Sequence, residues 1–257
     1  MSRPLRLALL GLAALLLLPG LVAVLGAMPG FGTDLPPYGA LINEIGPKER
    51  HVANLVSAIN FDIRGLDTLG EEFMLLAAIA GTVVLLRGSR GKKATDRAIR
   101  LPGRPVVPRA EAVTLLCRLF GPPTVVFGLY VVLHATVTPG GGFQGGVILA
   151  SGTLLFYLGE GYAGWRAAIH AEWLDALEGG GALLFTLCGL GPMLLGAAFL
   201  ENTLPLGSFK DLFSGGLILV ANLAVALAVF GGFTQLFLEF MEETRAPEDD
   251  DASSEEA

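Results

Sequence analysis

Six long apolar stretches constrain this chain more than any other feature of its sequence. A helix needs about 20 apolar residues to cross the hydrocarbon core of a bilayer, which is about 30 Å thick. The stretches cover residues 5–28, 69–86, 112–134, 145–163, 179–200 and 212–240. With 53% hydrophobic and only 16% charged residues, the sequence is also too apolar for an ordinary soluble domain. We therefore predict an all-α integral membrane protein with six transmembrane helices.

The charges between the second and third stretches set the predicted orientation. The segment from position 87 to position 109 contains eight Lys and Arg residues and a single acidic residue, Asp96. The positive-inside rule places such a loop in the cytoplasm, and counting spans from it places both termini there. This topology requires the first stretch to remain as a span, whereas a signal peptide would be removed. The stretch is longer than the usual apolar part of a signal peptide, so we expect six spans in the cell membrane of a bacterium or archaeon.

The same basic loop divides the chain into predicted parts. Residues 1–100 form a two-helix segment, residues 101–241 a four-helix domain, and residues 242–257 an acidic tail that we expect to be disordered. Outside that tail, acidic and basic residues balance, so we expect the lipid bilayer as a partner and no nucleic acid. Residues 165–178 have apolar positions at helical spacing, which predicts a short interfacial helix with Trp165 and Trp173 at the membrane surface.

Acidic residues at the start of the second stretch are the first candidate site. Its uninterrupted apolar part, residues 73–86, would span only about 21 Å as a helix. The helix must therefore draw Glu71 and Glu72 to the hydrocarbon boundary, with Asp67 one turn farther out on the face of Glu71. Ionisable groups at that depth usually face a protein interior or a water-filled path. A structural alternative is that Thr68 and Glu71 form a capping box at a helix start.

A glycine-rich loop lies between the third and fourth stretches. Gly140, Gly142 and Gly145 match the dinucleotide-binding pattern G-x-G-x-x-G, but the strand that this pattern requires is missing. We interpret the loop as a tight hairpin on the outer side, followed by Gly142 and Gly146 at a spacing that lets a neighbouring helix approach closely. The positions of interest are Pro139, Gly140, Gly141, Gly142, Phe143, Gly145 and Gly146.

Two further charges lie within the predicted spans. Arg118 and Glu160 fall within about two turns of the same membrane surface, so they can form an intramembrane pair, or each can extend to the interface alone. The two Cys and three scattered His residues suggest no metal site. No nucleophile, base and orienting group converge in the sequence. We therefore predict neither an enzyme nor a cofactor.

The two candidate stretches resemble a known family of transporters. The sequence around Asp62, Arg64, Asp67 and Glu71 resembles the D-x-R-G-x-D-T-L-G-E segment in the C-terminal part of the large A-type component of Mrp-type (Mnh) sodium/proton antiporters, and in the E-like component of related membrane-bound hydrogenases. The loop from residue 138 is similar to the signature of the antiporters' MnhB component. The resemblances cover roughly residues 5–87 and 109–240. The chain therefore resembles a fusion of two neighbouring subunits.

The resemblance implies functions for these residues. In the family, the acidic pair that corresponds to Asp67 and Glu71 is regarded as part of a cation or proton route, and Asp62 and Arg64 organise the entry to the helix. The family often has a His where this chain has Thr136, which removes a protonatable group from the loop. The implied function is an accessory membrane subunit of a multisubunit Na⁺/H⁺ antiporter. Its partners are other membrane subunits, and Na⁺ and H⁺ are the transported ions.

Two alternatives to the antiporter remain open from the sequence. The same chain can belong to the membrane arm of a redox-driven ion pump, such as a membrane-bound hydrogenase. It can also be a scaffold in which both motifs only pack helices. The double substitution of Asp67 by Asn and Glu71 by Gln in the assembled complex tests the acidic route. Undiminished sodium/proton exchange would show that these residues have only a structural role.

Overall fold

The computed structural model describes residues 3–28, 37–89 and 110–243. Within these ranges the chain forms helices and loops and no β-strand, which confirms the all-α class. Six of the helices are long and apolar enough to cross a membrane, so the prediction of a multi-pass membrane protein is confirmed. The elements are α1 (Arg3–Gly26), α2 (Pro37–Glu49), α3 (Leu55–Ala58), the π-helix η1 (Ile59–Ile63), α4 (Gly65–Ser89), α5 (Glu111–Leu133), α6 (Gly142–Ala168), α7 (Ala171–Leu194) and α8 (Leu217–Glu243).

The chain divides into two compact units, Met1–Leu41 and Ile42–Ala257. In the first unit, the apolar span of α1 buries none of its surface. Leucines are exposed at many successive positions of α1, including Leu15, Leu16 and Leu17, so the helix is apolar around its circumference. Such a helix is suited to contact lipid or other membrane helices on every side.

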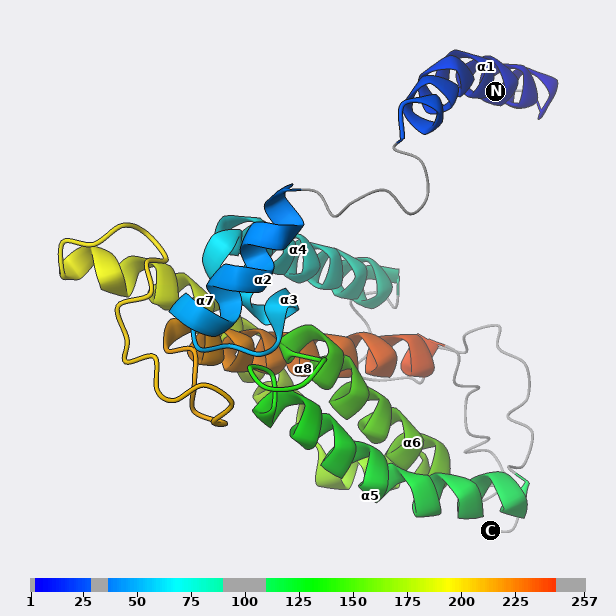
Figure 1. The fold of residues 1–257 in the computed structure, drawn as a ribbon. Helices are drawn as coiled ribbons and strands as arrows, with labels where there is room; N and C mark the ends of the chain where they lie inside the picture. The colour runs from blue at the N-terminus through cyan, green and yellow to red at the C-terminus, as the bar shows by residue number, and fades with distance from the viewer. Residues whose placement is uncertain (1–2, 29–36, 90–109, 244–257) are drawn as a thin grey trace, which may run out of the picture. The chain divides into compact units, whose positions relative to one another are not determined.

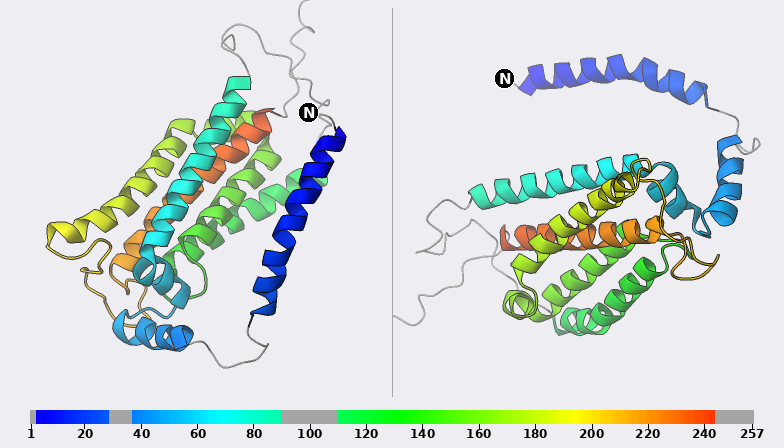
Figure 2. Two further views of the ribbon diagram at one scale, coloured as in Figure 1. Left: turned by 90° about the horizontal axis from the view of Figure 1, so that it is seen from above. Right: turned by 90° about the vertical axis from the view of Figure 1, so that its left-hand side faces the viewer.

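Helix α8 forms the centre of the second unit. It packs against α4, α6 and α7, while α5 packs mainly along α6 (Figures 1 and 2). About two thirds of the α8 span is buried, against 17% of the α4 span. Ile218, Ala221, Val225 and Val229 of α8 contribute fully buried side chains to the core. Contacts with α8 therefore hold α4, which belongs to the predicted two-helix segment, in the same unit as the four following helices.

Close helix crossings in this unit depend on glycine. At Gly146 of α6, a Cβ atom would lie 2.8 Å from Cβ of Val229 and 3.0 Å from the Ala226 carbonyl oxygen, both on α8. At Gly181 of α7, it would lie 2.5 Å from the Ala224 carbonyl oxygen, also on α8. The Gly142–Gly146 spacing thus brings α6 against α8, as the sequence predicts.

Two helix starts differ from the sequence predictions. Helix α4 begins at Gly65, so Thr68 lies inside it and donates a hydrogen bond to the Asn60 carbonyl oxygen at 2.7 Å. The capping-box interpretation is therefore wrong. Helix α8 begins at Leu217, five residues later than predicted, because the chain turns through Gly215 and Gly216 with φ values of 88° and 55°. Such positive φ angles favour glycine and are incompatible with a helix.

The predicted interfacial helix over residues 165–178 is also wrong. Helix α6 runs to Ala168, with a break at Gly161, where φ is 81°, and α7 begins only three residues later at Ala171. Trp165 is buried against Leu174 and Leu238, whereas Trp173 is exposed. Gly181, the last of the three glycines at 179–181, lies at a close crossing with α8 inside α7 and does not mark the start of that helix. The basic loop and the acidic tail lie outside the described residues, so the cytoplasmic termini, the division at residue 100 and the disordered tail stay predictions.

Candidate functional site

The segment that leads into α4 is joined to the glycine-rich loop by a buried polar network. Asn54 accepts a hydrogen bond from the Val56 amide and so caps α3. Its side-chain amide donates to the carbonyl oxygens of Ala135 at 2.8 Å and Gly140 at 2.9 Å. The backbone amides of Ala53 and Asn54 both donate to the Thr136 carbonyl oxygen. These hydrogen bonds join residues 81 and 86 positions apart in sequence, so the segment before α4 and the glycine-rich loop are parts of one structure.

The glycine-rich loop joins three helices. Gly140 has a φ of 135°, a conformation that glycine adopts without strain. The Gly142 amide donates to the side chain of Asn222 on α8 at 3.0 Å. A Cβ atom at Gly145 would lie 3.1 Å from the Gly128 carbonyl oxygen of α5. Among the remaining loop positions, Pro139 is exposed and Phe143 packs on the edge of the core. These contacts give the loop positions a packing role.

Charged residues at the entry to α4 form two separate ion pairs. Asp62 of η1 accepts a hydrogen bond from Arg50 at 2.5 Å. Arg64, in the turn before α4, donates from Nε to Asp67 at 2.6 Å. Asp62 therefore ties the π-helix to the end of α2, while Arg64 and Asp67 pair on the surface.

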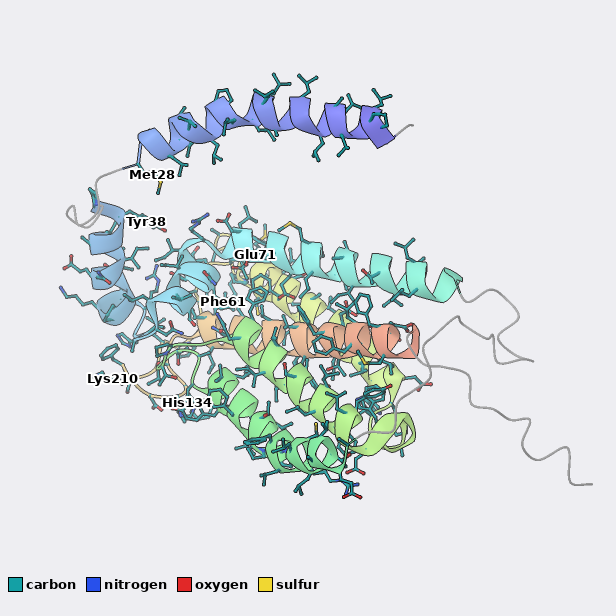
Figure 3. The ribbon with its side chains drawn as sticks, turned by 90° about the vertical axis from the view of Figure 1, so that its right-hand side faces the viewer. Met28, Tyr38, Phe61, Glu71, His134 and Lys210 are labelled. Atoms are coloured by element: carbon teal, nitrogen blue, oxygen red, sulfur yellow. The ribbon has the colours of Figure 1, made fainter. Side chains whose placement is uncertain are left out.

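The acidic residues of α4 occupy different environments. Asp67 and Glu71 are exposed on the surface of this chain (Figure 3 labels Glu71). Glu72, in contrast, is only 2% exposed, and its Oε1 atom has no hydrogen-bond partner within the described part of the chain. Seven helical residues precede Glu72, which places it about 10 Å along α4 from Gly65. The structure thus separates Glu72 from the other two acids.

Glu178 of α7 faces the same small cavity as Glu72. The cavity is also lined by Leu75, Ala182 and Ala228, and it is too small to hold a water molecule. Glu178 is 8% exposed, and its Oε1 atom likewise lacks a hydrogen-bond partner among the residues described. Two acidic side chains from different helices therefore line one small cavity within the candidate membrane spans, and in the described structure no hydrogen bond joins their carboxyl groups. A buried polar group without a partner is costly, so this arrangement needs an explanation beyond packing.

Glycines of α8 make room for the Glu178 side chain. A Cβ atom at Gly232 would lie 3.2 Å from Oε1 of Glu178, and one at Gly231 would lie 2.7 Å from the Glu178 amide nitrogen. The α8 backbone thus passes directly beside this carboxyl group. Larger residues at either position would push α7 and α8 apart.

Polar groups continue from Glu178 toward the N-terminal end of α7. Gln235 of α8 donates to Asp175, three residues before Glu178, at 2.7 Å. Asp175 is exposed, whereas Gln235 is buried. One turn beyond Gln235, Glu239 of α8 is 2% exposed. Acidic and amide groups therefore extend from the middle of the α4, α7 and α8 contact to an exposed carboxylate.

Arg118 and Glu160 form a pair elsewhere in the unit. Arg118 of α5 donates from Nε and Nη2 to the two carboxylate oxygens of Glu160 on α6, at 2.6 Å and 3.1 Å. This bidentate geometry is the strong form of an arginine–carboxylate contact. The pair lies between α5 and α6 and does not contact the acids of α4 and α7. In the part of the chain that is described, no three His, Cys, Asp or Glu residues are grouped to hold a metal ion.

Sequence reasoning selected Glu72 but missed Glu178. The sequence places Glu178 at the end of an expected interfacial helix, where a carboxylate would be ordinary. The available signal is Gly181, three residues after Glu178 inside an apolar stretch, where a Cβ atom would lie 2.5 Å from the Ala224 carbonyl oxygen of α8. A small residue at that position lets α7 approach α8 closely, and the acid one turn before it is buried in the same contact.

The four helices from α5 to α8 match a known family. Residues 112–235 fit the model of a domain related to the MnhB subunit of Na⁺/H⁺ antiporters. Residues 112–235, slightly less than half of the chain, are therefore similar to an MnhB-related domain. They include Glu178 and most of α8, whereas Glu72 comes from the segment before them.

Three relatives show further likeness, and two of them match more residues than the MnhB-related domain contains. An uncharacterised protein of Methanocaldococcus jannaschii is 29% identical over 75% of this chain and 79% of its own length. The probable A/B subunit of a K⁺/H⁺ antiporter of Rhizobium meliloti is 27% identical over 58% of this chain, but over only 16% of that larger protein. The B subunit of a Na⁺/H⁺ antiporter of Bacillus subtilis is 34% identical over 31% of this chain and 54% of its own length.

Two solved structures share the fold. One is a chain of the membrane-bound sulfane sulfur reductase, an archaeal respiratory membrane complex, with a TM-score of 0.66 and 28% identity. The alignment covers 92% of this chain and 98% of that one. The other is a chain of the Mrp complex from Dietzia sp. DQ12-45-1b, with a TM-score of 0.70. That alignment covers 96% of this chain and 27% of the chain from the Mrp complex. Because the sequence identity is only 23%, this likeness shows the fold alone. Both neighbours come from membrane complexes.

Proposed function

We propose that this chain is an accessory subunit of a multisubunit monovalent cation/proton antiporter, with Na⁺ and H⁺ as the exchanged ions. The MnhB-related domain and the antiporter components of Rhizobium meliloti and Bacillus subtilis support the class of complex. The exposed apolar surface of the six spans supports other membrane subunits and lipid as partners. The chain supplies one stretch of an ion or proton path within that assembly.

The meeting of Glu72 and Glu178 carries this proposal. Ionisable residues within membrane spans are costly, and rows of carboxyl groups serve as proton relays in pumps and transporters. Both carboxyl groups are buried, lie in one cavity and have oxygens without partners in the described structure. A side-chain movement that brings the two carboxyl groups within hydrogen-bonding distance would let one donate the proton that the other accepts.

The other acids extend this relay in both directions. Asp67 and Glu71, exposed near the start of α4, collect the ion or proton on the outer side and pass it to Glu72. Beyond Glu178, Asp175 and Glu239 lead toward the opposite surface. In this route Asp62 and Arg64 position the start of α4 through their ion pairs and carry no proton.

The experiment compares three glutamine substitutions in the assembled complex, reconstituted in vesicles with a pH-sensitive dye. Glu72→Gln and Glu178→Gln keep the shape of the buried side chains but cannot release a proton, so each should reduce cation-driven proton movement at least tenfold. Glu172→Gln, on the same helix as Glu178, exposed and outside the proposed route, is the matched control and should retain most of the rate. If both Glu72→Gln and Glu178→Gln keep the full rate of cation/proton exchange, these two residues only pack the helices, as the scaffold hypothesis states.

A second candidate is the membrane arm of a redox-driven ion pump. The match to a chain of the archaeal respiratory complex favours this candidate, because the alignment covers 98% of that chain's length and 92% of this chain. The same acidic relay would then move protons in response to electron transfer in partner subunits. Purifying the complex from its natural membrane and identifying its subunits separates the candidates, because iron–sulfur subunits would co-purify only in the redox-driven assembly.

A further inference from the structure

A groove between α5 and α6 is unrelated to the acidic site. It has a volume of about 560 Å³, within the range of sites that bind small molecules. Its walls are apolar and include Val125, Val126 and Phe156. Val126 is 66% exposed and Phe156 is 37% exposed, so the groove opens onto the outside of the helix bundle. In a membrane that surface faces the acyl chains of lipids.

Glycines explain why no side chain fills the groove. A Cβ atom at Gly121 would meet no atom within 4 Å, so the groove reaches the α5 backbone there. Gly152 and Gly159 of α6 lie close to α5, where added Cβ atoms would approach Val125 and Cys117 to 2.6 Å and 3.3 Å. The two helices are therefore close at these glycines, while Gly121 leaves space beside their contact.

One end of the groove is charged. Arg118 and Glu160 both line it, and their side chains are 59% and 32% exposed. Glu160 is the second-last residue of the apolar span Gly142–Gly161, so the pair lies at the membrane boundary. Past the break at Gly161 the chain turns, and Ile169 lines the same groove. A positive and a negative group thus stand together where apolar walls meet the headgroup level.

We infer that this groove binds a phospholipid with a phosphoethanolamine headgroup, one acyl chain lying in the groove and the headgroup bridging Arg118 and Glu160. Arg118 uses Nε and Nη2 in its pair with Glu160, so its Nη1 group can donate to the phosphate, while the remaining lone pairs of the Glu160 carboxylate accept from the ammonium group. A lipid with only a negative headgroup would be attracted by Arg118 but repelled by Glu160. The two charges therefore select a zwitterionic headgroup with a free ammonium over an anionic one. This site does not depend on the proposed transport function.

Native mass spectrometry of the purified full-length chain in detergent tests this inference. Phosphatidylethanolamine or phosphatidylglycerol with identical acyl chains is added, and the retained lipid is measured. We expect at least tenfold tighter retention of phosphatidylethanolamine. The variant Gly121→Leu fills the groove and should lower this retention at least tenfold. Gly81→Leu is the matched control, since a Cβ atom at Gly81 of α4 also meets nothing within 4 Å, and it should leave retention unchanged.

A second variant separates headgroup recognition from folding. Glu160→Gln removes the partner of the ammonium group but keeps the groove, so it should abolish the preference for phosphatidylethanolamine while phosphatidylglycerol still binds. Equal retention of the two lipids by the unmodified chain would overturn the inference, and so would equal retention in Gly121→Leu and Gly81→Leu. In the assembled complex, a crosslink from Val126→Cys to a helix of another protein would show that a protein occupies the groove, and would also overturn it.

Discussion

The close contact between α6 and α8 gives a prediction whose size follows from the coordinates. In Gly146→Ala the new Cβ atom would lie 2.8 Å from Cβ of Val229 and 3.0 Å from the Ala226 carbonyl oxygen. Non-bonded carbon atoms prefer about 3.5–4.0 Å, so the two helices must separate by about 0.7 Å or more. Overpacking of this kind costs about 1–3 kcal/mol.

A matched substitution isolates this cost. Gly81→Ala in α4 adds a Cβ atom that meets nothing within 4 Å. Both variants gain about 0.5–1 kcal/mol from replacing glycine inside a helix, so that gain cancels when they are compared. Gly146→Ala should therefore be about 1–3 kcal/mol less stable than Gly81→Ala, which corresponds to about a 5- to 150-fold difference in the unfolding equilibrium constant.

Equilibrium unfolding of the purified full-length chain measures this difference. The chain is held in a mild detergent, unfolded by increasing the mole fraction of dodecyl sulfate, and followed by circular dichroism. Equal stability of the two variants would show that α6 and α8 do not approach as closely at Gly146 as described, and would refute the packing argument for the Gly142–Gly146 spacing.

Two further predictions concern the polar network and the acidic site. Asn54→Ala removes the side-chain donor to the partly buried Gly140 carbonyl oxygen and one of the two donors to Ala135, which keeps its hydrogen bond from Ser57, and the same unfolding measurement should show a loss of about 1–3 kcal/mol; an unchanged stability would remove the network's role in joining the two motifs. Gly232→Ala places a methyl group 2.4 Å from Cδ1 of Ile79 on α4 and 3.2 Å from Oε1 of Glu178, so it should disturb the contact of α4, α7 and α8 and slow cation-driven proton movement in vesicles more than Gly81→Ala does; equal rates would argue against a role for that contact.

The sequence predicts the membrane spans well because length and hydropathy determine them. All six apolar stretches correspond to helices, since a run of about 20 apolar residues has few other stable structures. The helix boundaries are less certain from sequence. Charged and small residues can belong to a membrane helix where a neighbouring helix packs against it, as Glu178 and Gly181 show near the start of α7. A prediction from hydropathy places such residues outside the membrane.

The choice among neighbouring acids needs the tertiary structure. Adjacent residues on a helix point about 100° apart, so Glu71 and Glu72 cannot both face α7 and α8. Neither the apolar pattern of α4 nor the motif shows which of them is buried. The contacts of α4 with α7 and α8 place Glu72 inside and leave Asp67 and Glu71 on the surface of this chain. The sequence therefore finds the acidic stretch but not the residue at its centre, or its partner on another helix.

A double-mutant cycle on Glu72 and Glu178 tests the proposed relay most directly. Rates of cation-driven proton movement are measured in vesicles that contain the complex with Glu72→Gln, with Glu178→Gln, with both, or with neither. Residues that act as one unit give strongly non-additive losses. We predict that the double variant is no slower than the slower single variant, because either substitution already interrupts the same path. Losses that multiply in the double variant would show that the two carboxyl groups act independently, and would contradict the relay.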